Sequence, residues 1–261
     1  QHPHPGAGAA ALVEVLHLFL QFLFLFVFLH RRLVVSRGFP LLKGDGTGRA
    51  ARQPFTPITP PSWGAMACKR AFDIVCSLLG LVVLSPLLLV VSLLVAVTSP
   101  GGVFFRQERI GKGGKPFRIF KFRSMRKDNA GLKITTGNDS RITPVGRFLR
   151  KSKIDELPQL INVLVGDMSF VGPRPEVADY VNLYTPYQRQ VLVVRPGITG
   201  LASIRFRNEN DLLTASDDPN RTYVEQIMPR KIDLDLEYIP HASVFYDIKL
   251  IFQTFAVVIK E

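Results

Sequence analysis

Cysteine is scarce in this chain of 261 residues, which contains only Cys68 and Cys76. Two thiols are too few for a disulfide framework or a cysteine-rich metal cluster, so a reducing compartment is expected. Zinc-finger spacings and the aromatic motifs of RNA-binding domains are also missing, although the formal net charge is +12. We therefore predict no nucleic-acid partner. The excess of positive charge indicates an anionic lipid surface or phosphorylated substrates instead.

Charge is missing altogether from residues 74–97, a run of 24 residues. As a helix it would be about 36 Å long, enough to cross a hydrocarbon core of about 30 Å. Pro86, next to Ser85 in the middle of the run, removes a backbone hydrogen bond and bends a helix. Basic residues flank both ends, and cations mark the cytoplasmic side of a membrane. We therefore predict a re-entrant kinked helix at residues 66–102, with a straight spanning helix as the alternative.

Residues 1–65 lack a clear spanning segment. The apolar run from Val15 to Leu29 is short and carries polar interruptions, and no basic region precedes it, which disfavours a cleaved signal peptide. Residues 38–65 are rich in proline and glycine and predict a linker. Because translation could begin at Met66, residues 1–37 have two interpretations: an N-terminal membrane anchor or a non-native extension.

The remainder of the chain, residues 103–261, combines short strand and helix patterns. Two strand patterns lie within residues 103–125, and residues 127–140 predict a polar loop. Residues 143–144 form a helix start with proline at the first helical position, and a final amphipathic helix is expected at residues 247–259. These patterns predict a mixed α/β fold: a monotopic membrane protein with a re-entrant kinked helix, interfacial amphipathic helices and a small β-sheet.

An acidic pair, Asp155-Glu156, is the first candidate for chemistry. The residues from Ser152 to Asp155 resemble a capping box, which would place the pair in the first turn of a helix that ends at Gly166. The apolar face of that helix would consist of Leu157, Leu160, Ile161 and Leu164. Free N–H groups, the helix dipole and nearby cations would keep Asp155 ionised, as a nucleophile requires. Solvated surface charge is the alternative.

Positive charge gathers around this pair in the sequence. Arg150 precedes it, and Arg174 lies between two prolines that fix its direction, which suits bidentate recognition of phosphate. Lys121 and Arg123 alternate with aromatic residues, so they share a face of a predicted strand. Each cation could also be a solvated or membrane-facing charge. The functional interpretation is a pocket that neutralises a diphosphate.

A series of short segments after residue 68 carries a family resemblance. They are Lys-Arg-Ala-Phe-Asp (69–73), Leu-Ser-Pro-Leu (84–87), Thr-Ser-Pro-Gly (98–101), Val-Phe-Phe-Arg-Gln-Glu-Arg-Ile-Gly (103–111), Phe-Lys-Phe-Arg-Ser-Met (120–125), Asp-Glu-Leu-Pro-Gln-Leu-Ile-Asn-Val-Leu (155–164), Gly-Asp-Met-Ser-Phe-Val-Gly-Pro-Arg-Pro (166–175) and Arg-Pro-Gly-Ile-Thr-Gly (195–200). In this order they resemble the bacterial sugar transferases, the monotopic polyprenyl-phosphate phosphoglycosyl transferases.

The resemblance implies an enzyme and names its residues. In this family the aspartate of the Asp-Glu pair attacks the sugar-bearing phosphate of a UDP-sugar, UMP leaves, and a polyprenyl phosphate, typically undecaprenyl phosphate, takes the phospho-sugar from the covalent enzyme. By position, Asp155 would be the nucleophile and Glu156 its acidic partner, and both would bind Mg²⁺. The phosphate-contacting cations would be Lys121, Arg150 and Arg174, and the helix break of the re-entrant helix would be Ser85-Pro86.

The resemblance also implies a location and a pathway. The catalytic domain, residues 103–261, would face the cytoplasm from the bacterial inner membrane and start an exopolysaccharide, capsule, O-antigen or glycoprotein glycan. A homo-oligomer is compatible with the sequence. Two alternatives stay open: direct transfer, in which Asp155 only holds the metal, and a non-catalytic, membrane-anchored scaffold that binds anionic lipids. UMP release from a UDP-sugar would exclude the scaffold.

Overall fold

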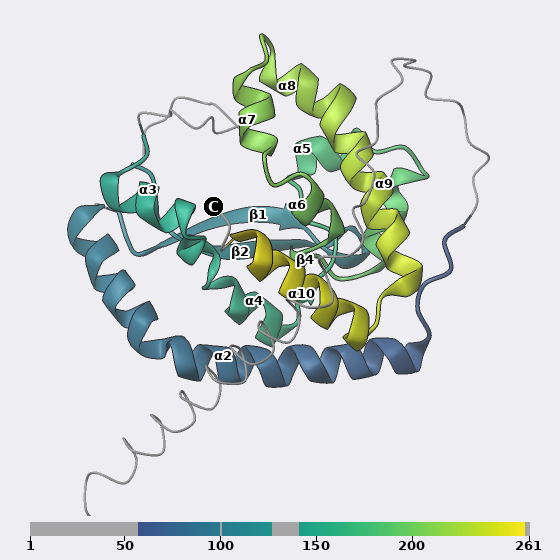
Figure 1. Ribbon diagram of the computed structural model, residues 1–261, viewed down its shortest axis with the longest axis horizontal. Coiled ribbons are helices and arrows are strands. Elements are labelled where there is room, and N and C mark those ends of the chain that lie inside the picture. The colour runs from purple at the N-terminus through teal and green to yellow at the C-terminus, as the bar shows by residue number, and fades with distance from the viewer. Residues whose placement is uncertain (1–56, 100, 127–140, 259–261) are drawn as a thin grey trace, which may run out of the picture. The chain divides into compact units, whose positions relative to one another are not determined.

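The computed structural model describes residues 57–99, 101–126 and 141–258 (Figure 1). These residues belong to one compact unit, residues 55–261. The predictions for the N-terminal apolar run, for most of the linker and for the loop at residues 127–140 lie outside the described residues.

Helix α2, Trp63–Thr98, is the longest described element. Among the described residues it is the one helix that is long and apolar enough to cross a membrane. Its ribbon changes direction in the second half (Figure 1), and Pro86 lies inside it. The Ser85 hydroxyl donates to the Val82 carbonyl at 2.7 Å. That carbonyl is the one whose helical N–H partner proline removes, so the Ser-Pro pair keeps it satisfied.

Helix α2 buries polar side chains in its first half and exposes large apolar side chains. Its buried residues in the first half are polar, Lys69, Asp73 and Ser77, and they follow one another at one-turn spacing. The exposed large apolar residues of α2 are Ile74, Val75, Leu78, Leu79, Val82, Leu87, Leu89, Val90, Leu93, Leu94 and Val97. A helix in water would show the reverse arrangement, whereas lipid favours an apolar exterior. The arrangement is compatible with a monotopic membrane protein.

Lys69 forms a buried ion pair with Asp247 of α10, Val244–Val258. Its ammonium also donates to the Val171 carbonyl at 2.9 Å. The Tyr238 hydroxyl donates to the other Asp247 oxygen at 2.6 Å. Lys69 was interpreted from the sequence as a charge that flanks the membrane helix, and the structure uses it to hold α2 against the C-terminal part of the fold.

The next two polar residues of α2 bind other elements. The Asp73 carboxylate accepts from the Ser169 hydroxyl and from the Phe170 N–H, both at 3.1 Å. Arg70 donates to the carbonyls of Val163 and Leu164 at 2.6 and 2.9 Å. These carbonyls lie in the last turn of α4, where helix carbonyls lack intrahelical partners. Helix α2 is therefore tied by side-chain hydrogen bonds to the elements around the acidic pair.

The small β-sheet of the prediction consists of two separate pairs of strands. Strands β1, Phe104–Ile110, and β2, Pro116–Phe122, form an antiparallel hairpin, and β3, Ser169–Val171, pairs in parallel with β4, Gly197–Thr199. Helices dominate the rest of the described chain (Figure 1). They are α3 (Pro144–Lys151), α4 (Gln159–Val165), α5 (Ala178–Val181), α6 (Leu201–Arg205), α7 (Glu209–Thr214), α8 (Pro219–Thr222) and α9 (Met228–Tyr238), followed by α10.

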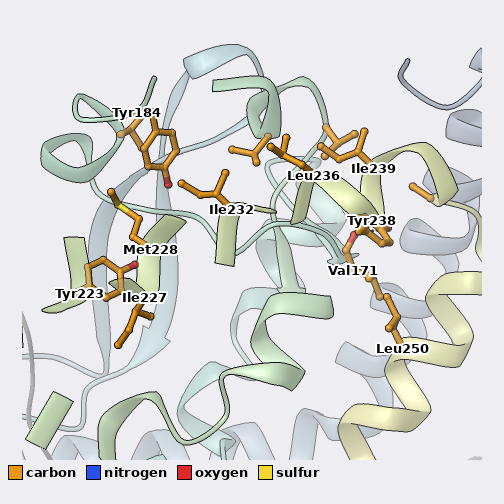
Figure 2. Close-up of a cluster of buried hydrophobic side chains, with 14 of the residues drawn as sticks. Val171, Tyr184, Tyr223, Ile227, Met228, Ile232, Leu236, Tyr238, Ile239 and Leu250 are labelled. Carbon is orange, nitrogen blue, oxygen red and sulfur yellow. The ribbon is translucent and has the colours of Figure 1, made fainter. Parts of the chain in front are cut away.

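Two apolar clusters fix the elements that carry the acidic pair and its cations. Figure 2 shows the larger cluster, which packs α9 and α10 against β3 with side chains such as Ile232, Leu236 and Val171. The smaller cluster joins the second half of α2 to β2 and α3 and consists of Val91, Val95, Phe122 and Leu149. Close packing of this kind makes neighbouring elements move together, so the site rests on a rigid frame.

Candidate active site

The acidic pair lies on a short 3₁₀ turn, Ile154–Glu156, between α3 and α4. The Ser152 hydroxyl donates to the Phe148 carbonyl at 2.8 Å and thus caps the end of α3. Lys153 then takes a left-handed conformation with φ of 58°, and α4 begins only at Gln159. The predicted capping box was therefore wrong, because the serine serves the preceding helix and the pair stands ahead of α4.

Other local predictions are confirmed. The Thr143 hydroxyl accepts from the Gly146 N–H at 2.9 Å at the start of α3, with Pro144 in the first turn. Gly166 ends α4 with a φ of 97°. The predicted apolar face of this helix was wrong in part, because of Leu157, Leu160, Ile161 and Leu164 only Leu160 is buried. The buried residues beside it are Gln159, Asn162 and Val163.

Glu156 is held between two cations that the sequence had assigned to phosphate. Its carboxylate accepts from the Lys121 ammonium at 2.8 Å and from the Arg174 guanidinium at 2.7 Å. Burial raises the pKa of Glu156, but Arg174 and Lys121 outweigh it and hold that pKa well below its ordinary value. Glu156 in turn raises the pKa of Arg174, while burial lowers the pKa of Lys121. Glu156 is therefore a firmly ionised carboxylate.

Asp155 has a different environment. The residue is 8% exposed, and its buried Oδ1 has no hydrogen-bond partner in the part of the chain that the structure describes. Burial and the neighbouring Glu156 raise the pKa of Asp155, and Lys121 and Arg150 oppose that rise. The expectation that cations keep this carboxylate ionised is therefore countered by burial. A carboxylate oxygen without a partner is free to bond a ligand atom.

The other two predicted cations lie elsewhere. The Arg150 guanidinium donates to the Met125 sulfur at 3.4 Å and acts on Asp155 through its charge. Arg123 follows the end of β2, and its guanidinium lies so close to Gly101 that a Cβ built there would be 2.0 Å from Nη1. Of the four cations predicted from the sequence, the structure brings Lys121 and Arg174 into direct contact with the acidic pair.

The direction of Arg174 is set by a close approach of two backbones. The Gly172 N–H donates to the Thr199 carbonyl at 3.0 Å, and the Gly197 N–H donates to the Pro173 carbonyl at 2.9 Å. A Cβ built on Gly197 would lie 2.1 Å from the Gly172 nitrogen, so no side chain fits there. The segments at residues 166–175 and 195–200 are thus structural partners that position the arginine.

Two contributions to the site were missed from the sequence. Arg109 donates to the Pro175 carbonyl at 3.1 Å and lies 3.6 Å from Glu176, so it supports the Pro-Arg-Pro loop. Asn162 accepts from the Phe120 N–H and donates to the Arg118 carbonyl, both at 2.9 Å, and thereby fastens α4 to β2. Arg109 alternates along β1 with Phe105 and Gln107 on the hairpin face of Lys121, a pattern that the sequence could have revealed. No local signal distinguishes Asn162.

The implied magnesium ion can be tested against these residues. No group of three or more possible metal ligands of the His, Cys, Asp and Glu types occurs among the described residues. Mg²⁺ is commonly bound by one or two carboxylates together with substrate phosphates and water. Asp155, with its open oxygen, and the adjacent Glu156 fit an ion that is shared with a phosphorylated ligand.

Comparison with known proteins places these motifs in one family. The bacterial sugar transferase family model matches residues 64–261. The UDP-glucose:undecaprenyl-phosphate glucose-1-phosphate transferase of Escherichia coli (strain K12) is 40% identical over 234 residues, which cover 87% of this chain and 45% of that protein. The UDP-N-acetylgalactosamine-undecaprenyl-phosphate N-acetylgalactosaminephosphotransferase of Aeromonas hydrophila is 39% identical over 191 residues, covering 71% of this chain and 42% of that protein.

A shorter relative is matched over almost its whole length. The exopolysaccharide production protein PSS of Rhizobium leguminosarum bv. phaseoli is 42% identical over 199 residues, which cover 72% of this chain and 94% of that protein. This chain thus spans less than half the length of the first two relatives and almost the whole of the third. With a family match that includes nearly all of α2 and every element of the acidic site, the chain belongs to the bacterial sugar transferase family.

Proposed function

We propose that this protein transfers a sugar phosphate from a UDP-sugar to undecaprenyl phosphate, with Asp155 as a covalent nucleophile. The observation that carries the proposal is the unequal pair of acids. Glu156 is fixed between Lys121 and Arg174, whereas Asp155 keeps a buried oxygen without a partner. The names of the relatives supply the chemical class of donor and acceptor.

In the first step an Asp155 oxygen attacks the sugar-bearing phosphorus of the donor. An oxygen–phosphorus bond forms, the bond from that phosphorus to the UMP oxygen breaks, and UMP leaves with the electron pair. The cations Lys121 and Arg174 stabilise the negative charge that develops on the phosphate oxygens. Arg150 and Arg123 contribute positive charge at longer range. The product is an acyl phosphate that carries the sugar.

In the second step an oxygen of undecaprenyl phosphate attacks the same phosphorus. The bond to Asp155 breaks, the carboxylate is regenerated, and the lipid leaves as a diphosphate-linked sugar for polysaccharide synthesis. Asp155 and Glu156 would hold Mg²⁺ together with the donor phosphates, and the ion would reduce the charge repulsion among these anions. Two-step transfer through one nucleophile predicts ping-pong kinetics.

The membrane arrangement follows from α2 and the exposed aromatic residues. We place α2 in the cytoplasmic leaflet of the bacterial inner membrane as a re-entrant helix, with its exposed apolar side in lipid and the domain at residues 103–261 in the cytoplasm. Helices α3 and α10 would lie at the interface, because Phe148 and Phe245 are 65% and 87% exposed. The phosphate of a membrane lipid can then reach Asp155 without leaving the bilayer.

A direct transfer without a covalent intermediate is the second candidate. The observation that favours it is the burial of Asp155, which raises the pKa of a group that must be ionised to attack. In that case Asp155 would hold the metal, and the lipid phosphate would attack the donor itself. UMP would then appear only in the presence of the lipid.

One experiment separates the two mechanisms. The protein is mixed with UDP-glucose or UDP-N-acetylgalactosamine labelled in the sugar, without any lipid acceptor. The covalent mechanism predicts one UMP per active site and a labelled protein, and Asp155→Asn should abolish both. A labelled adduct on Asp155→Asn, or UMP release that requires the acceptor, would contradict a covalent Asp155.

A further inference from the structure

Phe105 stands directly opposite Lys121 in the β1–β2 hairpin. Side chains of directly opposed residues in an antiparallel pair point to the same face, with Cβ atoms about 5 Å apart. The Lys121 ammonium reaches Glu156 on that face. Phe105 therefore borders the cation that contacts the acidic pair, although neither local sequence nor the mechanism above gives it a role.

The Phe105 ring is partly exposed to solvent although it lies beside the acidic site. Its residue surface is 44% exposed. The adjacent Phe104 has a similar exposure of 40% but points to the other face, where its ring stacks on Phe122 and meets Phe120 edge to face. Phe104 thus has aromatic partners that account for its position. No ring contact of Phe105 occurs in the part of the chain that the structure describes.

Phe105 lies seven residues after Thr98, the last residue of α2. Strand β1 follows the end of α2, where Val97 is 86% exposed, after a short turn, and Val103 packs against the buried cluster of Val91, Val95, Phe122 and Leu149. Figure 1 shows the end of α2, α3 and the beginning of β1 gathered on one side of the unit. Phe105 therefore lies beside Lys121 at the end of the hairpin face that is nearer in sequence to α2, whereas Arg109, at the far end of the same strand face, points to Glu176.

We propose that Phe105 binds the hydrocarbon of the lipid phosphate acceptor, in the isoprenyl units next to the phosphate, while that phosphate lies at Lys121. An apolar ring beside a cation, on a strand that begins near the end of a helix with an exposed apolar side, matches a molecule with a phosphate head on an apolar chain. The inference rests on the proposed function, since it assigns the acceptor end of the same site. The uridine end of the donor then lies on the side away from α2.

The experiment compares a long and a short acceptor. Undecaprenyl phosphate and geranyl phosphate are supplied in detergent micelles, and kcat/KM is measured for transfer to each. Phe105→Ser should reduce the preference for the long acceptor at least tenfold, and Phe105→Leu should retain most of it because an apolar contact survives. UMP release in a single turnover without acceptor should change by less than about twofold, because that step does not involve the lipid.

Phe104→Ser is the matched control, since it removes the same ring one position away on the opposite face. It should lower thermal stability and leave the preference between acceptors unchanged. An unchanged preference in Phe105→Ser overturns the inference. A rise in the KM for the UDP-sugar, with slower UMP release, also overturns it, because Phe105 would then belong to the donor site.

A binding measurement separates failure of this inference from failure of the proposed function. Geranylgeranyl phosphate and inorganic phosphate are titrated calorimetrically into Asp155→Asn with and without Phe105→Ser. Asp155→Asn should bind geranylgeranyl phosphate more tightly than inorganic phosphate. If this difference in affinity disappears when Phe105→Ser is added, the inference is supported even where the parent chain releases no UMP. Equal extra affinity with and without Phe105 excludes it, whatever the reaction proves to be.

Discussion

Glu156→Gln should weaken the fold and yet tighten the binding of UDP. In the structure both Lys121 and Arg174 donate to the same Glu156 oxygen, at 2.8 and 2.7 Å. The carboxylate is 14% exposed on its side chain. Removing one partner of a buried ion pair costs about 3–5 kcal/mol, because the remaining charges are left without compensation. Two cations left side by side should therefore lower the free energy of unfolding by that amount.

The same change removes a competitor for the cations. A diphosphate must draw Lys121 and Arg174 away from Glu156 and approach a like charge, which costs about 1–4 kcal/mol at 4 Å with water-like to surface-like screening. With the charge gone, we expect UDP to bind about tenfold more tightly, a gain of about 1.4 kcal/mol. Calorimetric titration with UDP in EDTA measures this effect without a metal ion.

Glu225→Gln provides the control for the loss of one negative charge. Glu225 pairs with Arg221 on an exposed helix surface, with side chains 55% and 71% exposed, so its loss should cost less than about 1 kcal/mol and leave UDP affinity unchanged. Weaker binding of UDP to Glu156→Gln in EDTA would refute the reasoning. Glu156 would then orient the cations for phosphate instead of competing for them.

Buried groups elsewhere give three further expectations. Burial raises the pKa of Asp235 from 3.8 to about 7, so the free energy of unfolding of the parent chain falls as the pH rises toward 7. Asp235→Asn lacks this dependence, so urea unfolding should show its stability relative to the parent chain rising by about 3 kcal/mol from pH 5 to pH 8. Lys69→Met and Asp247→Asn should each cost about 3–5 kcal/mol, while the double variant costs less than their sum in a mutant cycle. Ser85→Ala should cost about 1 kcal/mol in detergent, and a second change, Pro86→Ala, should restore it by returning a backbone N–H.

Each of these expectations has an outcome that contradicts it. An equal pH dependence of Asp235→Asn and the parent chain would show that Asp235 does not titrate in this range. Additive costs for Lys69→Met and Asp247→Asn would show that the two charges do not interact. If the double variant at Ser85 and Pro86 is less stable than Ser85→Ala, the bend itself stabilises the protein.

The sequence predicted those features that depend on neighbouring residues. A threonine followed by proline begins α3, and a glycine ends α4, because both signals act within one helical turn. The capping box failed for a related reason, since Ser152 can bond backward to Phe148 as readily as forward. The left-handed conformation of Lys153 separates Ser152 from the helix that follows, and the sequence pattern does not predict that conformation.

Long-range pairing accounts for what the sequence could not predict. Lys121 and Arg174 were identified as cations that favour phosphate, but their shared partner Glu156 lies 35 and 18 residues away, respectively. The partner of Arg150 is a methionine sulfur, which no charge pattern indicates. Lys69 and Arg70 were interpreted as flanking charges, because their partners come from strands and helices that are brought near only by the complete fold.

The distance along the chain between Lys69 and Asp247 also constrains how the protein is made. The two residues are separated by 178 positions, and at about 5–20 residues per second the ribosome needs roughly 10 to 35 s to add them. During that interval α2 has left the ribosome with a charged side that has no partner. The attachment of α2 to α10 is therefore completed only when synthesis is nearly finished, and a nascent chain stopped before α10 should remain a substrate for chaperones and proteases.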